Sequence, residues 1–217
     1  MRTPFILFSA VSLASVALIA VAQTPRNRAP LPNEQWVSLF NGKDLAGWDQ
    51  VGKEKWTAED GLIHGKAVTK DYGYLQTAKD YKDFQMALRF KCIADGNSGV
   101  FFHTRFKPGT ADVSQGMQFE IDPTLNHHTG GLYGDGRGWI AWPSPENEYV
   151  LHQQDWNDYL LKVEGNHYVA RLNGVVVIDF TDPSPKSFDG TIALQLHAGG
   201  GGDMMFKDLY VRDMSVR

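Results

Sequence analysis

The sequence predicts an all-β fold in which two sheets pack face to face as a sandwich or jelly roll. Three observations lead to this prediction. Short segments alternate between apolar and polar residues, and turn pairs such as Asp-Gly and Asn-Gly recur between them. After position 22, no segment of 11 or more residues follows a convincing helical period. Many short strands without intervening helices are typical of a sandwich.

The clearest strand is expected between Phe84 and Cys92. Its apolar residues occupy every second position, which places them on one face of a strand and would scatter them around a helix. Residues 167–172 and 175–180 flank Asn173-Gly174, the strongest short signal for a hairpin. A short helical turn is expected at most within residues 155–161.

Composition and charge exclude several classes of protein. The chain has 217 residues, of which 42% are hydrophobic and 21% are charged, as in an ordinary globular protein. Its formal charge of −4 gives no electrostatic basis for binding nucleic acid. Cys92 is the only cysteine, so no disulfide can form within the chain, and we expect it to fill the core.

The N-terminal residues read as a targeting segment. Residues 1–22 combine Arg2, an apolar run and a small-residue cleavage pattern that ends at Ala22, which predicts a signal peptide. Residues 23–34 contain three prolines and are expected to form an extended linker to one β-sandwich domain at 35–217. We therefore expect a periplasmic or secreted protein with no membrane span after cleavage.

Polar residues at every second position mark three strands where a site is expected. The solvent-facing positions of an ordinary strand are not expected to carry these particular polar side chains. A curved sheet, in contrast, can bring polar side chains from neighbouring strands together in a groove. Within residues 99–105, 116–122 and 195–197, the polar faces would present these candidates: Phe101, His103 and Arg105; Gln118, Glu120 and Asp122; Gln195 and His197. Two carboxylates at spacing two can acquire different pKa values and so act as acid and base.

Residues 127–142 are expected to form a long glycine-punctuated loop that binds sugar. Aromatic rings cover the C–H faces of a sugar while charged groups bond its hydroxyls. The candidates in this segment are Tyr133, Arg137, Trp139 and Trp142. No Gly-x-Ser-x-Gly motif and no phosphate-binding lysine motif accompanies the glycines. No cofactor is required by the sequence, and a divalent cation near Glu120 and Asp122 has no motif spacing to support it.

The same residues resemble a known family. Segments similar to the 3-keto-disaccharide hydrolase domain follow one another in the family's order: Ser38–Trp48, Trp56–Gly61, Tyr81–Phe84, Asn97–Phe102, Trp156-Asn157, Leu172–Gly174 and Gly190–His197. The resemblance implies a concanavalin A-like sandwich with a concave sheet, acting on sugars oxidised at C3. His103 stands where the family commonly has an arginine, and Glu120 lies two residues after the family's usual acidic position.

For such a substrate, the resemblance implies cleavage by removal of the C2 proton, elimination and hydration. Glu120 or His103 would act as the base, with Asp122 or His197 orienting or donating. Arg105 or Arg137, together with Gln195, would hold the oxyanion. Two alternatives stay open. One is a retaining glucanase that uses Glu120 and Asp122, and the other is a carbohydrate-binding domain without catalysis.

Overall fold

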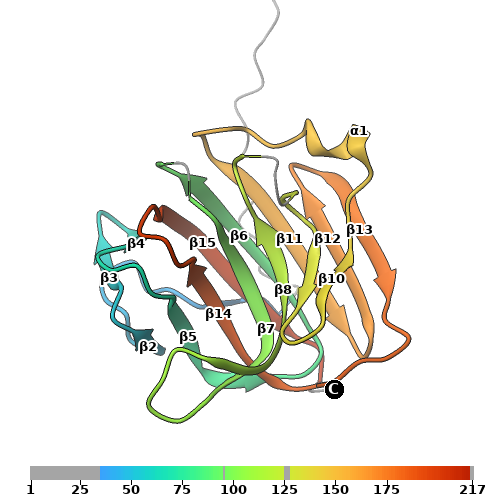
Figure 1. Cartoon of the computed structure of the whole chain (residues 1–217), viewed down its shortest axis with the longest axis horizontal. Coiled ribbons are helices and arrows are strands. Elements are labelled where there is room, and N and C mark those ends of the chain that lie inside the picture. The colour runs from blue at the N-terminus through green and yellow to red at the C-terminus, as the bar shows by residue number, and fades with distance from the viewer. Residues whose placement is uncertain (1–34, 95, 125–127, 216–217) are drawn as a thin grey trace, which may run out of the picture.

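The structure is a computed structural model, and it describes residues 35–94, 96–124 and 128–215. The predicted all-β fold is confirmed, because two antiparallel sheets pack face to face as a sandwich (Figure 1). The expected signal peptide at 1–22 and linker at 23–34 lie outside the described residues. No helix in the described part of the chain is long and apolar enough to cross a membrane.

Within the described residues, the first sheet has the strand order β13-β12-β11-β6-β15-β4-β3, and β1 pairs with β15. Its strands are β1 (Val37–Ser38), β3 (Lys55–Glu59), β4 (Leu62–Lys66), β6 (Phe84–Cys92), β11 (Asn157–Glu164), β12 (His167–Leu172), β13 (Val175–Thr181) and β15 (Asp203–Asp213).

The second sheet has the order β10-β9-β8-β7-β14-β5-β2 over the same described ranges. Its strands are β2 (Trp48–Gly52), β5 (Gly73–Tyr81), β7 (Ser98–Phe106), β8 (Val113–Ile121), β9 (Leu132–Gly134), β10 (Gly138–Ala141) and β14 (Gly190–Leu196). Three adjacent strands of this sheet, β8, β7 and β14, contain or adjoin the three segments in which a site is expected from the sequence.

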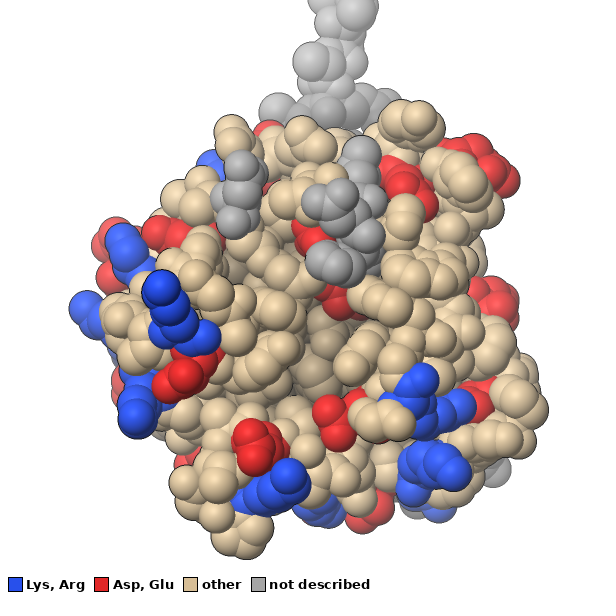
Figure 2. Space-filling model, viewed as in Figure 1, with Lys and Arg blue, Asp and Glu red and all other residues tan. Residues whose placement is uncertain are grey.

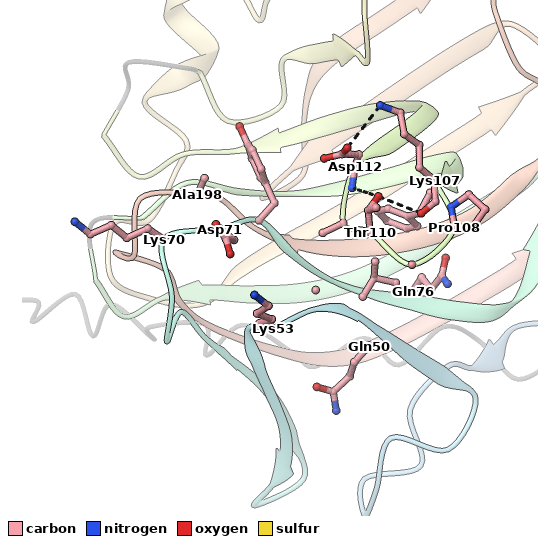
Figure 3. Close-up of a pocket in the computed structure, with 16 residues that line it drawn as sticks. Gln50, Lys53, Lys70, Asp71, Gln76, Lys107, Pro108, Thr110, Asp112 and Ala198 are labelled. Atoms are coloured by element: carbon pink, nitrogen blue, oxygen red, sulfur yellow. Dashed lines mark hydrogen bonds and ion pairs between the residues drawn. The ribbon is translucent and has the colours of Figure 1, made fainter.

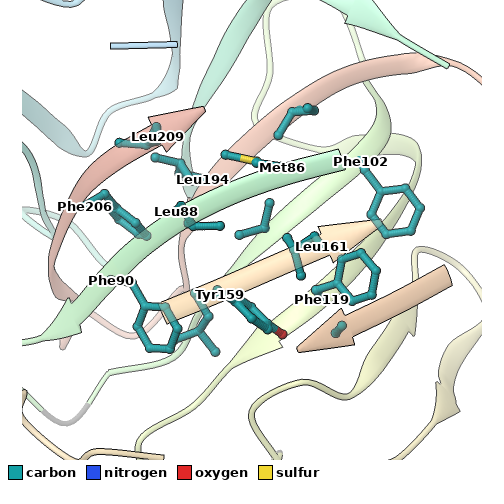
Figure 4. Close-up of a cluster of buried hydrophobic side chains, with 14 of the residues drawn as sticks. Met86, Leu88, Phe90, Phe102, Phe119, Tyr159, Leu161, Leu194, Phe206 and Leu209 are labelled. Carbon is teal, nitrogen blue, oxygen red and sulfur yellow. The ribbon is translucent and has the colours of Figure 1, made fainter. Parts of the chain in front are cut away.

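The core between the sheets follows from the alternating pattern. Along β6 every second residue from Phe84 to Cys92 is buried, as predicted. Phe102 and Phe119 of the second sheet stack inside the core, with ring centroids 5.0 Å apart (Figure 4). Burying such a side chain contributes about 1.5–3 kcal/mol. The inward residues thus fix which side chains of β7 and β8 face outward.

The predicted hairpin is present as β12 and β13. Both turn residues have positive φ, 50° at Asn173 and 87° at Gly174, as this turn requires. The expected helical turn at 155–161 is wrong, because most of that segment belongs to β11. A short helix instead forms at α1 (Pro145–Glu148), where a proline occupies the first turn.

The expected loop at 127–142 is wrong for residues 132–134 and 138–141, which are strands. His127 lies outside the described residues, but β9 and β10 form a hairpin that extends the second sheet by pairing with β8. Gly136 has a φ of 67° in the turn between them. Tyr133 and Trp139 are therefore fixed on strands rather than carried by a loop, and Trp142 directly follows β10.

Candidate functional site

A cavity of about 600 Å³ opens on the outer face of the second sheet. Figure 2 shows a hollow near the middle of this face, with acidic side chains at its edge. Its lining comes from strands and from the segments that adjoin them: Tyr72, Tyr74, Asn97, Phe101, Lys107, Ala111, Asp112, Val113, Gln118, Glu120, Tyr133, Asp135, Gly136, Trp139, Gln195 and His197.

Strand register places the central lining residues in two rows across the sheet. Residues paired directly on neighbouring strands point to the same face. One row runs from β5 to β8 through Tyr74, Gln195, Gly99 and Glu120. The other row runs from β14 to β10 through Ala193, Phe101, Gln118, Tyr133 and Trp139. The pairing alone therefore brings five of the expected site residues, Glu120, Gln118, Gln195, Tyr133 and Trp139, to one face.

Glu120 is the buried acid of the cavity, with only 2% of its surface exposed. The side-chain amide of Asn97 donates to Oε1, and Gln118 Nε2 donates to Oε2 at 2.7 Å. Burial raises the pKa of Glu120 to about 9, and the charge of Asp122 adds to the rise, which the two hydrogen bonds only partly offset. Glu120 is therefore a neutral acid at pH 7, with a proton to donate.

Amide groups link Glu120 to the centre of the sheet. Gln118 Nε2 also lies 3.3 Å from Gln195 Oε1, and Gln195 Nε2 lies 3.5 Å from the hydroxyl of Tyr74. The rings of Tyr74 and Phe101 meet edge to face at 5.4 Å and form an apolar floor with Ala193. An apolar floor with a row of amide donors and acceptors suits a sugar ring, which has C–H faces and hydroxyl edges.

His197 lies at the edge of the cavity, just beyond the end of β14. Its Nδ1 is 2.9 Å from the carbonyl oxygen of Ala198, so Nδ1 carries the hydrogen in the neutral ring. Nε2 is then the acceptor, and the Tyr72 hydroxyl lies 3.3 Å from it. The Tyr72 and His197 rings also contact edge to face at 4.9 Å. The arrangement leaves the basic nitrogen of His197 on the side of Tyr72.

An aromatic wall borders the cavity on the side of β9 and β10. Tyr133 contacts Trp139 edge to face at 5.4 Å, and Trp139 stacks on Trp142 at 4.2 Å. Trp142 does not line the cavity itself, and 46% of its surface is exposed. Trp142 packs against Trp139 from outside the cavity. The sequence placed Trp142 among the sugar-binding residues, but the structure does not place it in the lining.

The expectation that Phe101, His103 and Arg105 share one face is wrong. The register of β7 against β8 shifts between Phe102 and Arg105, and His103 has a φ of 52° at this bulge. His103 is fully buried away from the cavity, and its Nε2 contacts the Lys82 carbonyl oxygen at 2.7 Å. Arg105 is held by Asp80 through two hydrogen bonds of 2.9 and 2.6 Å.

The side chains of Arg137 and Asp122 also do not line the cavity. Arg137 forms a two-pronged ion pair with Asp182, at 2.6 and 3.0 Å, and does not line the cavity. Asp122 lies just past the end of β8, where its Oδ1 accepts hydrogen bonds from the amide and hydroxyl of Thr124. Its carboxylate is buried and acts on Glu120 through its charge.

Sequence reasoning did not select several lining residues as site candidates. Tyr72 and Tyr74 flank Gly73 at spacing two, which is the same signal that identified the other strands. Asn97 precedes β7 in the Asn-Ser-Gly segment, and only the fold shows that its amide reaches Glu120. Asp112 belongs to a loop and Asp135 to a turn, where sequence spacing gives no direction for a side chain.

Within the residues that the structure describes, no three His, Cys, Asp or Glu side chains lie together in a way that could hold a metal ion.

Comparison with known proteins decides the family. The family model described as the 3-keto-alpha-glucoside-1,2-lyase-like domain matches residues 35–212. The chain belongs to this family. The resemblance noted from the sequence motifs is thus confirmed, and the lyase-like domain spans both sheets of the sandwich.

Similar proteins agree with this assignment. A curated protein of Bacteroides thetaiotaomicron named 3-keto-disaccharide hydrolase is 32% identical over an alignment of 94 residues that covers 39% of this chain. The match spans about a third (32%) of the length of that relative. The names of the family and of this relative both support a carbohydrate-active protein.

Solved structures agree in fold. One is a protein of Parabacteroides distasonis whose name gives it as a proposed glycosyl hydrolase, with a TM-score of 0.66 and 24% identity over 84% of this chain and 95% of that one. Another is a carbohydrate-binding module of Bacillus subtilis, with a TM-score of 0.57 and 15% identity over 78% of this chain and 95% of that one. These likenesses establish a concanavalin A-like sandwich fold for the lyase-like domain.

Proposed function

We propose that the protein cleaves glycosides whose sugar is oxidised to a ketone at C3, and that the cavity around Glu120 is its active site. The observation on which this proposal rests is the buried Glu120 carboxyl, held by the amides of Gln118 and Asn97 above an apolar floor. A ketone at C3 acidifies the C2 proton, and its removal places negative charge on the C3 oxygen. Catalysis therefore needs a base and a group that stabilises this oxyanion.

Glu120 is the group we assign to the oxyanion. Because the pKa of Glu120 is raised to about 9, its carboxyl is protonated at neutral pH and can donate a hydrogen bond. Gln118 and Gln195 lie beside it and provide further amide donors. A neutral acid in a buried site stabilises a developing oxyanion more strongly than water does.

His197 is the group we assign to the proton transfer. The contact of Nδ1 with the Ala198 carbonyl makes Nε2 the acceptor nitrogen, and Nε2 would take a proton from C2 in place of its hydrogen bond with the Tyr72 hydroxyl. The imidazolium so formed can return the proton to the C1 oxygen as the C1–O bond breaks and a C1–C2 double bond forms. Addition of water to that double bond then gives the free keto sugar.

The other functions considered from the sequence have less support. A retaining glucanase would use Glu120 with Asp122, but only Glu120 lines the cavity. The aromatic wall would suffice for a binding domain without catalysis. A buried acid with a raised pKa, such as Glu120, is instead typical of a catalytic site. We also propose that the protein works in the periplasm or outside the cell, on the basis of the signal-like residues 1–22.

The proposal is tested by incubating the full protein with 3-keto-trehalose, 3-keto-lactose and the two unoxidised sugars. Release of sugar from the keto substrates alone is expected. Release from the unoxidised sugars, or from a plain glucan added as a further substrate, would support a glucanase instead, and binding without release would support a binding domain. Glu120→Gln should reduce turnover at least about a hundredfold, while Glu146→Gln, an exposed acid on α1 outside the cavity, should leave it unchanged.

A further inference from the structure

A second depression of about 800 Å³ lies next to the cavity. Tyr72, Lys107, Ala111 and Asp112 line both hollows, so the two adjoin each other. The depression lies between the end of β2, the segment that leads into β5, and the 107–112 loop that joins β7 to β8 (Figure 3). It therefore extends the site in the direction away from the aromatic wall.

The 107–112 wall is held in shape by its own hydrogen bonds. Lys107 N donates to the Asp112 carbonyl at 2.9 Å, and Thr110 N donates to the Lys107 carbonyl at 3.1 Å. The Thr110 hydroxyl accepts from Asp112 N at 3.1 Å, and Lys107 Nζ lies 3.6 Å from Asp112 Oδ2. The wall is thus formed before any ligand binds, which lowers the entropy that binding must overcome.

The opposite wall is anchored by Glu54, a buried acid that the proposed reaction does not use. Its carboxylate accepts hydrogen bonds from the backbone amides of Val68 and Thr69 and from the Thr69 hydroxyl. These bonds hold the segment that positions Tyr72. Gly52 allows the close approach of β2, since a Cβ there would lie 2.6 Å from the Tyr72 carbonyl oxygen.

We propose that this depression is the subsite for the leaving group, and that it takes a second sugar joined through the C1 oxygen. Its lining includes side chains that can form hydrogen bonds with hydroxyls, among them Gln50, Lys53 and Gln76. Such groups match the hydroxyls of a sugar better than they match an apolar aglycone. This inference rests on the proposed function, because it assumes that the keto ring occupies the cavity around Glu120.

The junction of the two hollows fits the position of the bond that breaks. His197 lines the cavity, the next residue Ala198 lines the depression, and Tyr72 lines both. A C1–O bond held at this junction would have the keto ring beside Glu120 and the leaving sugar beside Lys53. His197 would then be adjacent to both C2 and the C1 oxygen.

The test compares two substrates that differ only in the leaving group, 3-keto-trehalose and methyl 3-keto-α-glucoside. The variant Gln50→Ala/Lys53→Ala removes two exposed lining side chains, and Lys43→Ala removes an exposed lysine outside both hollows. We expect kcat/KM for 3-keto-trehalose to fall about tenfold in the double variant. The methyl glycoside should change by less than about twofold, and Lys43→Ala should affect neither substrate. Equal losses on both substrates, or no loss on either, would overturn the subsite.

A second measurement separates failure of the subsite from failure of the proposed function. If the wild-type protein cleaves neither substrate, the proposed function fails. The subsite is then judged by titrating the protein with 3-keto-trehalose and following its backbone amides by NMR. Shifts at Thr110 and Ala111 that the methyl glycoside does not produce would support it. Shifts confined to the cavity around Glu120, or no binding, would overturn it.

Discussion

Gly99 lies directly against the side chain of Gln118, so that a Cβ built on this glycine would come within 2.7 Å of Gln118 Cγ. Gly99 also pairs with Glu120 on one side and with Gln195 on the other. The missing side chain leaves the space in which the Gln118 amide reaches the Glu120 carboxyl. A glycine on a central strand therefore sets the geometry of the proposed active site.

Gly99→Ala should displace the Gln118 amide from Glu120 and lower kcat/KM at least about tenfold. The fold should persist, because the displaced side chain faces the cavity rather than the core. Steady-state kinetics on a keto glycoside measures the effect. The double variant Gly99→Ala/Gln118→Ala should lose little more than Gln118→Ala alone, and additive losses would show that Gly99 acts in another way.

The stability of Glu120→Gln relative to the wild type should increase as the pH rises. Since burial raises the pKa of Glu120 to about 9, the folded state keeps a proton that the unfolded state loses near pH 4.5. The wild type thus loses stability between about pH 4.5 and 9, while the glutamine has nothing to ionise. Thermal unfolding of both proteins at pH 5, 7 and 9 should give a Tm difference that widens with pH. A constant difference would contradict the raised pKa.

Arg137→Met should destabilise the protein by about 3–5 kcal/mol at pH 7, because it leaves Asp182 as a buried charge without its partner. The Asp182 side chain is fully buried, and Arg137 lowers the pKa of its carboxyl. The stabilisation is present above the ordinary aspartate pKa of about 4 and is lost as the pH falls through the lowered value. Chemical denaturation measures it, and Arg137→Met/Asp182→Asn should recover part of the loss. If the single variant is as stable as the wild type, the pair has no structural role.

His64, on the first sheet, should stabilise the protein at low pH, whereas the Arg137–Asp182 pair loses its stabilising effect at low pH. It lies between Glu59 Oε1 at 2.5 Å and Asp203 Oδ1 at 2.7 Å. Burial would lower the pKa of His64, but the hydrogen bonds to Asp203 and Glu59 outweigh it and raise the pKa. This stabilisation is full below about pH 6.5 and is lost as the pH rises through the raised value. The Tm loss in His64→Gln should therefore be larger at pH 5.5 than at pH 9, and the reverse order would refute it.

Alternation in the sequence was sufficient to predict the faces of regular strands. Gln118 and Glu120 lie together because β8 keeps a period of two, and Gln195 joins them by register with β7. The same reasoning failed at His103, where a bulge adds a residue and reverses the later side chains. No local signal in residues 99–105 marks that bulge, since its register depends on pairing with β8.

Long-range partners account for the other differences. Arg137 was assigned to sugar binding because it lies among aromatic residues, but Asp182, 45 residues later, pairs with it. Asn97 reaches Glu120 across 23 residues. The β9–β10 hairpin was expected as a loop because its strands are too short for alternation to be recognised.

We propose above that Glu120 acts as a neutral acid in the cleavage of keto glycosides. The most direct measurement is the pH dependence of kcat/KM on 3-keto-trehalose between pH 6 and 10, with the uncatalysed rate subtracted. Because kcat/KM reports the free enzyme, the limb that belongs to Glu120 should fall above about pH 9, by about tenfold per pH unit. Glu120→Gln should lose that limb together with most of the activity. A kcat/KM that instead rises through pH 9 would mean that the ionised Glu120 carboxylate is the active form. That result would contradict the proposed role of Glu120 as a neutral acid.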